Sequence, residues 1–86
     1  MKKETLTVET NDLGTVIYRN ASGDFHNPHA PAVVGADGQT EHWIHGQRHN
    51  PHGPAVVEAD VRKEHYIYGK YLTKAEFKIW QAQQTK

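Results

Sequence analysis

The sequence predicts a mainly β protein of the α+β class, an antiparallel meander of about three repeated β-hairpins followed by one C-terminal helix. The main observation is an internal repeat, because residues 26–34 (HNPHAPAVV) return 23 positions later as residues 49–57 (HNPHGPAVV). A fixed internal period indicates that one supersecondary unit is stacked on its own copy. Runs of β-branched residues alternate with turn residues, which is typical of hairpins. The period then changes to a helical one after residue 72.

The first hairpin is predicted from residues 5–19. Residues 5–10 alternate polar and apolar side chains, which is the period of a half-buried strand, so we expect Leu6 and Val8 to face inward. Residues 11–14 end in a glycine that can adopt positive φ, and the following five residues form the returning strand.

The second hairpin follows the first copy of the repeated motif. Pro28 and Pro31 lack backbone donors, which keeps the motif itself out of a sheet interior. Residues 32–36 and 40–45 then pair around a strong Asp-Gly turn signal.

The third hairpin follows the second copy and pairs residues 55–59 with 62–68. Its turn has Asp60-Val61 where the second hairpin has Asp-Gly. We therefore expect this turn to be wider or strained, because valine does not readily adopt positive φ.

The helix is predicted over residues 73–84, after residues 69–71 close the sheet. Thr73 and Glu76 have the spacing of a capping box, and Leu72 has the position of a hydrophobic staple to Phe77. More than half of the helix circumference is uncharged, so we expect it to pack on one face of the sheet. The uncharged side chains are Phe77 and Trp80 on one flank, with Ala75, Ile79 and Ala82 on the next.

The chain is expected to be a single domain of 86 residues with a thin core, because a chain this short buries only somewhat more than ~60% of its unfolded surface. We divide it into an N-terminal hairpin that is a half-repeat (1–22), repeat 1 (23–45), repeat 2 (46–72) and the C-terminal helix (73–84).

Charge and composition restrict the class of protein. Ten basic and ten acidic side chains cancel, which argues against a general binder of nucleic acid or anionic membranes. The absence of cysteine favours a cytoplasmic setting over secretion. The lysines near the N-terminus precede no apolar run, and no window is long enough to span a bilayer, so we expect a soluble, untargeted protein.

The repeated motif has the pattern Gly-x-x-His-x-x-x-Gly-Pro-Ala, followed by a glycine turn and an aromatic strand. Over roughly residues 13–72 it resembles the MORN-like variant repeats of small bacterial and phage proteins. The positions that carry the resemblance and are expected to be structural are His26, Pro31, Gly46, His49, Gly53, Pro54 and Gly69. The resemblance implies successive hairpins in one extended sheet and a role in protein contact, but no reaction.

The chain departs from this pattern in two ways. Ala30 stands where glycine is usual, and Asn-Pro-His replaces the Arg-Glu-Asp that is common in such repeats. The second departure removes charges that could carry a contact specific to the family.

Histidines make a metal site one candidate. Seven are present, and six form His-x-x-His pairs at residues 26 and 29, 42 and 45, and 49 and 52, a spacing that can place two imidazoles on one ion. Equivalent residues of successive repeats should lie about 10 Å apart, too far for His26 and His49 to share an ion. In the alternative, structural interpretation, His26 and His49 bond loop carbonyls while His29 and His52 cap turns. We expect no resident metal or other cofactor.

An enzyme is not expected. The chain has no cysteine, and its one serine, Ser22, sits in a Ser-Gly loop without an obvious base beside it. Neither a glycine-rich phosphate loop nor a dinucleotide fingerprint occurs.

A single-stranded nucleic-acid binder is a second candidate, since aromatic side chains interleave with basic ones as in stacking platforms. Glutamates at residues 41, 58, 64 and 76 dilute the basic character. The aromatic and basic residues concerned are Arg48, Arg62, Lys63, Tyr66, Tyr68, Lys70, Tyr71, Lys74 and Lys78.

Protein recognition is the function that we favour. A short helix covers only one sheet face, so the other face and the edges near Thr5 and Tyr68 remain open to a partner or to a second copy of the chain. Strand alternation predicts Trp43, Tyr66 and Tyr68 on one face, opposite Ile44 and Ile67. The candidate partner-binding residues, of types that dominate interface hot spots, are Trp43, Tyr66, Tyr68, Arg48 and Trp80. Together with the resemblance, this suggests a small phage or bacterial inhibitor or adaptor that binds a host or cognate protein.

Overall fold

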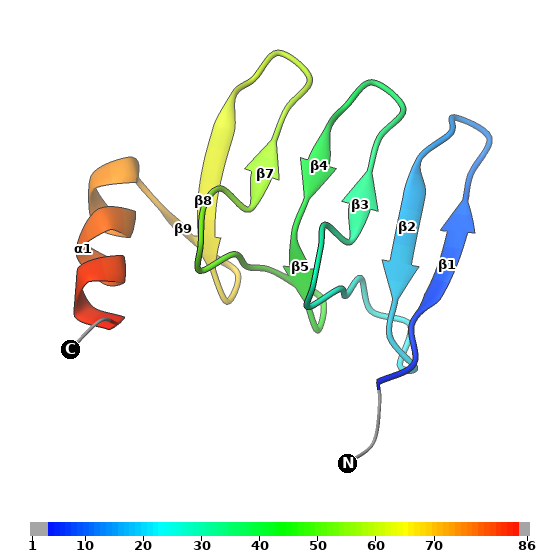
Figure 1. The fold of residues 1–86 in the computed structure, drawn as a ribbon, viewed down its shortest axis with the longest axis horizontal. Helices are drawn as coiled ribbons and strands as arrows, with labels where there is room; N and C mark the ends of the chain where they lie inside the picture. Colours follow the sequence, from blue (N-terminus) through cyan, green and yellow to red (C-terminus); the bar gives the residue numbers. More distant parts are fainter. Residues whose placement is uncertain (1–3, 85–86) are drawn as a thin grey trace.

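A computed structural model describes residues 4–84 of the chain. Within that range the protein is mainly antiparallel β with a single C-terminal helix, which confirms the predicted fold class (Figure 1). The prediction of no targeting signal concerns the N-terminal residues, and residues 1–3 lie outside the described range. No helix among the described residues is long and apolar enough to cross a bilayer.

The three predicted hairpins are present and follow one another along the sheet (Figure 1). They are β1 (Thr7–Thr10) with β2 (Val16–Arg19), β3 (Val33–Val34) with β4 (Thr40–Glu41), and β7 (Val56–Val57) with β8 (Lys63–Ile67). Antiparallel pairs also join β2 to β3 and β4 to β7, so the hairpins share one continuous sheet. Its register aligns Ile17 with Val33, and Glu41 with Val56.

The described residues contain two strands, β6 and β9, that were predicted only as a connection and a closing segment, and the predicted strand 40–45 is divided into β4 and β5. β5 (Trp43–Ile44) pairs with β6 (Gln47–Arg48), and β9 (Lys70–Leu72) returns on β8. Both turns have two successive residues at positive φ, His45-Gly46 and Tyr68-Gly69, as a type I′ hairpin requires. The expectation of six strands was therefore incomplete, because His-Gly and Tyr-Gly lack the Asn-Gly or Asp-Gly signature of this turn.

Hydrogen bonds repeat with the 23-residue period. The Asn27 N–H donates to the Trp43 carbonyl at 3.0 Å, and the Asn50 N–H donates to the Tyr66 carbonyl at 3.1 Å. A Cβ added to Gly53 would meet nothing closer than an Asn50 side-chain nitrogen at 4.0 Å. Alanine therefore fits at this position of the motif, and residue 30 is an alanine in the first copy.

The structure corrects the roles predicted for the motif histidines. His26 and His49 do not bond loop carbonyls; their Nδ1 atoms accept the backbone N–H groups of His45 and Tyr68 at 2.8 and 2.9 Å. His29 and His52 do not cap turns through their side chains. Asparagines do so, since the Asn27 and Asn50 side-chain oxygens accept the N–H groups two residues on at 3.1 and 3.0 Å.

The turn of the third hairpin is strained rather than wider. The Val61 N–H donates to the Glu58 carbonyl at 2.9 Å, as the Gly38 N–H does to the Gly35 carbonyl at 3.1 Å in the second hairpin. Val61 adopts a φ of +65° at the position where Gly38 has +93°. The two turns thus have the same length, and a β-branched residue occupies a conformation that suits glycine.

Helix α1 (Lys74–Gln84) begins where the sequence predicts. The Thr73 N–H donates to the Glu76 carboxylate at 2.8 Å, and the Glu76 N–H donates to the Thr73 hydroxyl at 3.1 Å, which is the capping box. Leu72 and Phe77, the predicted staple residues, are both buried.

The predicted packing of α1 on one face of the sheet is present only at the end of that face, where Phe77 stacks on His65. The helix contacts mainly β8 and β9 and lies at the end of the sheet (Figure 1). Ile79 on its second flank is 62% exposed. Most of the sheet is therefore a single layer, in a molecule with extents of 39 × 39 × 16 Å.

The core is correspondingly thin. The buried apolar side chains of the described residues are Ala32, Ala55, Val56, Leu72 and Phe77. Leu6 is half-buried as predicted, but Val8 is 60% exposed because no second layer covers β1. The edge strands are β1 and β9, and Tyr68 lies in the turn that joins β8 to β9.

Candidate functional site

The sheet has two different faces beside the helix end. His65 aligns with Leu72 and stacks on Phe77 with ring centroids 4.2 Å apart, so α1 lies on the face that bears His65. Tyr66 is the next residue on β8 and points to the opposite face. We call this opposite side the aromatic face, and its members are Arg19, Phe25, Trp43, Arg48, Tyr66 and Tyr71.

Arg48 links the two repeats on the aromatic face. Its guanidinium carbon lies 5.2 Å from the centroid of the Trp43 ring and 5.3 Å from that of Tyr66. The Arg48 Nε is buried without a hydrogen-bond partner among the described residues, whereas Nη1 donates to the Tyr66 hydroxyl at 3.4 Å. The rings and this hydrogen bond together hold the side chain. With Gly46 and Gly69, the three side chains line a shallow hollow of about 240 Å³.

Carboxylates lie among these rings and cations. The Trp43 indole N–H donates to Glu41 at 2.8 Å, and the same Glu41 oxygen lies 3.8 Å from an Arg48 nitrogen. In the next repeat the Tyr66 hydroxyl donates to Glu64 at 3.4 Å. The spacing Glu-x-Trp at residues 41–43 recurs as Glu-x-Tyr at 64–66, a signal in the sequence from which these carboxylates could have been predicted.

The structure places the five predicted partner-binding residues at three separate locations. Trp43, Arg48 and Tyr66 lie together on the aromatic face. Tyr68 does not share that face, so the prediction from strand alternation was wrong at this residue. Its φ of +46° ends the alternation, and its ring stacks on His49 at a centroid distance of 4.0 Å. Trp80 lines a separate hollow beside His52.

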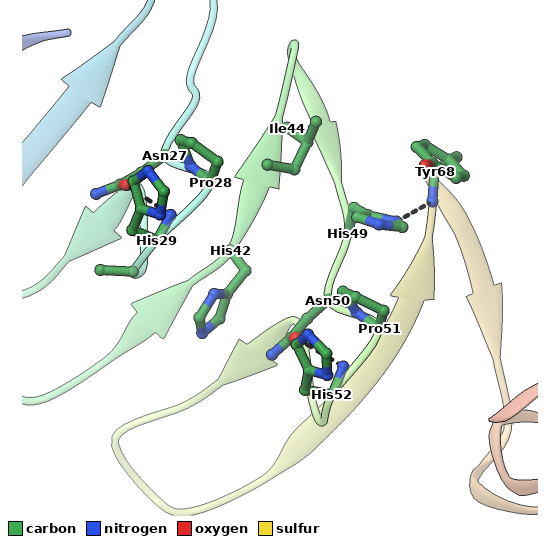
Figure 2. A pocket seen from close by; sticks show the side chains of 11 residues that line it. Asn27, Pro28, His29, His42, Ile44, His49, Asn50, Pro51, His52 and Tyr68 are labelled. Atoms are coloured by element: carbon green, nitrogen blue, oxygen red, sulfur yellow. Dashed lines mark hydrogen bonds between the residues drawn. The ribbon is translucent and has the colours of Figure 1, made fainter. Parts of the chain in front are cut away.

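A second hollow lies between the two copies of the motif. We call it the inter-repeat pocket; it has a volume of about 340 Å³, and Figure 2 shows the side chains around it. Burial lowers the pKa of His42 and His49 below the usual value of 6.5. The lining residues are Asn27, Pro28, His29, Ala30, His42, Ile44, His49, Asn50, Pro51, His52 and Tyr68.

No group of three potential metal ligands among the described residues contains both members of a predicted His-x-x-His pair. The one group of three potential ligands within reach of a common ion is Glu4, His26 and His45, whose ligand atoms lie within 4.8 Å of one another. His26 accepts a backbone N–H at Nδ1, so its Nε2 carries the proton and donates to Glu4 at 2.8 Å. A protonated Nε2 has no lone pair for a metal, and this hydrogen bonding therefore accounts for the cluster without an ion.

Comparisons with protein-family models, curated proteins and solved structures found no match for this chain. The resemblance to MORN-like variant repeats therefore stays a prediction from the repeated motif.

Proposed function

We propose that the protein is a non-enzymatic protein-binding module whose partner contacts the aromatic face. The observation that supports this is the placement of Arg48 between Trp43 and Tyr66, half-buried on a face that α1 leaves open. Tryptophan, tyrosine and arginine are the residues that most often dominate the energy of protein interfaces. Because the repeats already hold these side chains in place, binding would cost little conformational entropy.

A protein fits this face better than a single-stranded nucleic acid. Rings beside guanidinium groups are a stacking platform for bases, which keeps nucleic acid as the second candidate. However, Glu41 lies beside Trp43 and Arg48, and Glu9 pairs with Arg19 at 2.6 Å. These carboxylates neutralise the cations that phosphates would need and would repel a phosphate backbone.

The resemblance to repeats of bacterial and phage proteins supports a cytoplasmic inhibitor or adaptor whose partner is a host or cognate protein. The test is an affinity capture from bacterial lysate with the tagged full chain, with and without nuclease and chelator. We expect enrichment of one protein that survives both treatments. Capture that is lost under nuclease would favour the nucleic-acid candidate, and loss under the chelator would favour a metal-dependent function.

Variants on the two faces locate the surface. Trp43→Ala and Tyr66→Ala should abolish capture while circular dichroism shows a folded chain. Tyr68→Ala and Trp80→Ala are matched aromatic controls away from this face and should leave capture unchanged. If only the control variants lose the partner, the assignment of the partner to the aromatic face is wrong.

A further inference from the structure

His26 and Glu4 show how this repeat binds a carboxylate. The His26 side chain is 2% exposed, and its Nδ1 accepts the His45 N–H at 2.8 Å. This bond fixes the neutral tautomer with the proton on Nε2, which donates to the Glu4 carboxylate at 2.8 Å. A buried, oriented N–H of this kind is a fixed donor to an anion.

His49 is equivalent to His26 in the next repeat, but no carboxylate corresponding to Glu4 lies beside it. Its Nδ1 accepts the Tyr68 N–H at 2.9 Å, so its Nε2 also carries the proton, and it is 9% exposed. The described residues supply no hydrogen bond to this Nε2. The 23-residue period puts Asn27 at the place of Glu4, but the Asn27 amide is occupied within its own loop, by the His29 N–H and the Pro31 carbonyl.

The space beside His49 is open and suited to an anion. The inter-repeat pocket of about 340 Å³ lies there, lined by four histidines and no acidic side chain (Figure 2). A volume of this size is at the lower end of those that bind small ligands. In the first repeat the corresponding hollow contains Glu4 and Asp24.

We propose that the inter-repeat pocket binds the acidic side chain of an extended polypeptide, with the Nε2–H of His49 as the donor to its carboxylate. A polypeptide fits better than a small acid because the pocket shares Pro51 and His52 with the hollow of about 370 Å³ beside Trp80. An apolar residue next to the acidic one would lie against Trp80. This site is independent of the proposed function, because it lies away from the aromatic face.

The titratable groups around the site come from both copies of the motif and from the strands between them. They are His29, His42, His49, His52 and Tyr68. His49 stays neutral in this arrangement, since a proton on Nδ1 would oppose the Tyr68 N–H. The donor to the carboxylate is therefore the neutral imidazole of His49.

The test is an NMR titration of the full chain that follows the His49 imidazole. The probe is the peptide acetyl-Leu-Glu-Leu-amide, and its glutamine analogue is the control. We expect saturable shifts of the His49 Nε2 and Trp80 indole signals, with a Kd on the order of 1 mM, as for a short flexible ligand. The glutamine analogue should bind about tenfold more weakly, because the charge-assisted hydrogen bond is lost.

A variant tests the comparison with the first repeat. Glu4→Ala should release the His26 Nε2–H and make His26 respond to the same peptide, while the matched variant Glu9→Ala should not. The proposal is overturned if the peptide does not shift the His49 Nε2 signal of the wild-type chain. It is also overturned if the glutamine analogue binds as tightly as the glutamate peptide. If propionate alone binds as tightly as the peptide, the assignment to a polypeptide is overturned. None of these results bears on partner capture through the aromatic face.

Discussion

His49 and Tyr68 contact each other through two different interactions. The Tyr68 N–H donates to Nδ1 of His49 at 2.9 Å, and the two rings stack with centroids 4.0 Å apart. His26 and His45 repeat this relationship, at 2.8 Å and 4.2 Å, 23 residues earlier. In both pairs the second residue has positive φ, so each motif histidine holds the type I′ turn that follows it.

We therefore expect His49→Ala to destabilise the protein by about 2–3 kcal/mol, because it leaves the Tyr68 N–H without its acceptor and removes a stacked ring. Urea denaturation followed by circular dichroism measures the loss. The matched control is His52→Ala, an exposed histidine of the same motif, which should change stability by less than about 0.5 kcal/mol. Equal effects of the two variants would show that the histidine does not hold the turn.

Val61→Gly should stabilise the protein by about 0.5–1 kcal/mol. Relief of the left-handed backbone at a β-branched residue is worth roughly 1–2 kcal/mol, and the greater freedom of glycine in the unfolded chain offsets part of it. The reciprocal variant Gly38→Val places the same strain in the second hairpin, where a Cβ would meet no atom within 4 Å. Gly38→Val should destabilise the protein by a similar amount, as measured by thermal denaturation. If Val61→Gly also lowers the stability, the backbone at Val61 is not strained.

Arg48→Lys should cost about 1 kcal/mol, since an ammonium group does not stack on two rings as a planar guanidinium does. The fluorescence of Trp43 should also change. Arg62→Lys is the control, because the Arg62 side chain is 78% exposed and pairs only with Asp60 among the described residues. An unchanged denaturation midpoint for Arg48→Lys would mean that the contacts with Trp43 and Tyr66 contribute little.

Stability should fall as the pH decreases below about 6.5. Burial lowers the pKa of His42 and His49 in the folded chain, so the unfolded chain binds protons first. Their contribution is thus complete above pH 6.5 and is lost as the pH falls through the folded pKa values. Urea denaturation between pH 8 and pH 5 measures the slope, which His42→Gln should reduce.

His49→Gln tests the second of these groups, since it too should reduce the slope. Two carboxyl groups titrate below this range. Hydrogen bonds from the Arg62 backbone lower the pKa of Asp60, and hydrogen bonds from the Thr73 backbone lower that of Glu76. A pH dependence that both histidine variants preserve would show that other groups cause it.

The predictions from sequence succeeded where an interaction is local in the chain. The capping box of Thr73 and Glu76 and the turn at residues 37 and 38 depend on residues within a few positions of each other. The strain at Val61 was likewise predictable, because the repeat aligns it with a glycine. The two I′ turns after Ile44 and Ile67 were missed, since their first residues are not the usual types.

The candidate site was predicted less well, because it depends on residues from different repeats. Trp43 and Tyr66 share a face as predicted, with Arg48 between them. Tyr68 does not share it, since its left-handed backbone reverses the direction of the side chain. The carboxylates beside the rings and the inter-repeat pocket were not predicted. The carboxylates lie two residues from the rings that they contact, so the Glu-x-Trp and Glu-x-Tyr spacing was a local signal that was overlooked. The pocket brings residues 27–30 together with residues 49–52, which no local pattern reveals.

The sequence by itself determined the period of 23 residues, the succession of three hairpins and the start of the helix, because backbone propensities and turn chemistry act over short distances. The tertiary structure alone decided where α1 packs, which face stays open, and which histidine has a carboxylate partner. Those outcomes depend on the lateral stacking of repeats, in which His26 meets Glu4 but His49 meets an asparagine that is already hydrogen-bonded within its own loop.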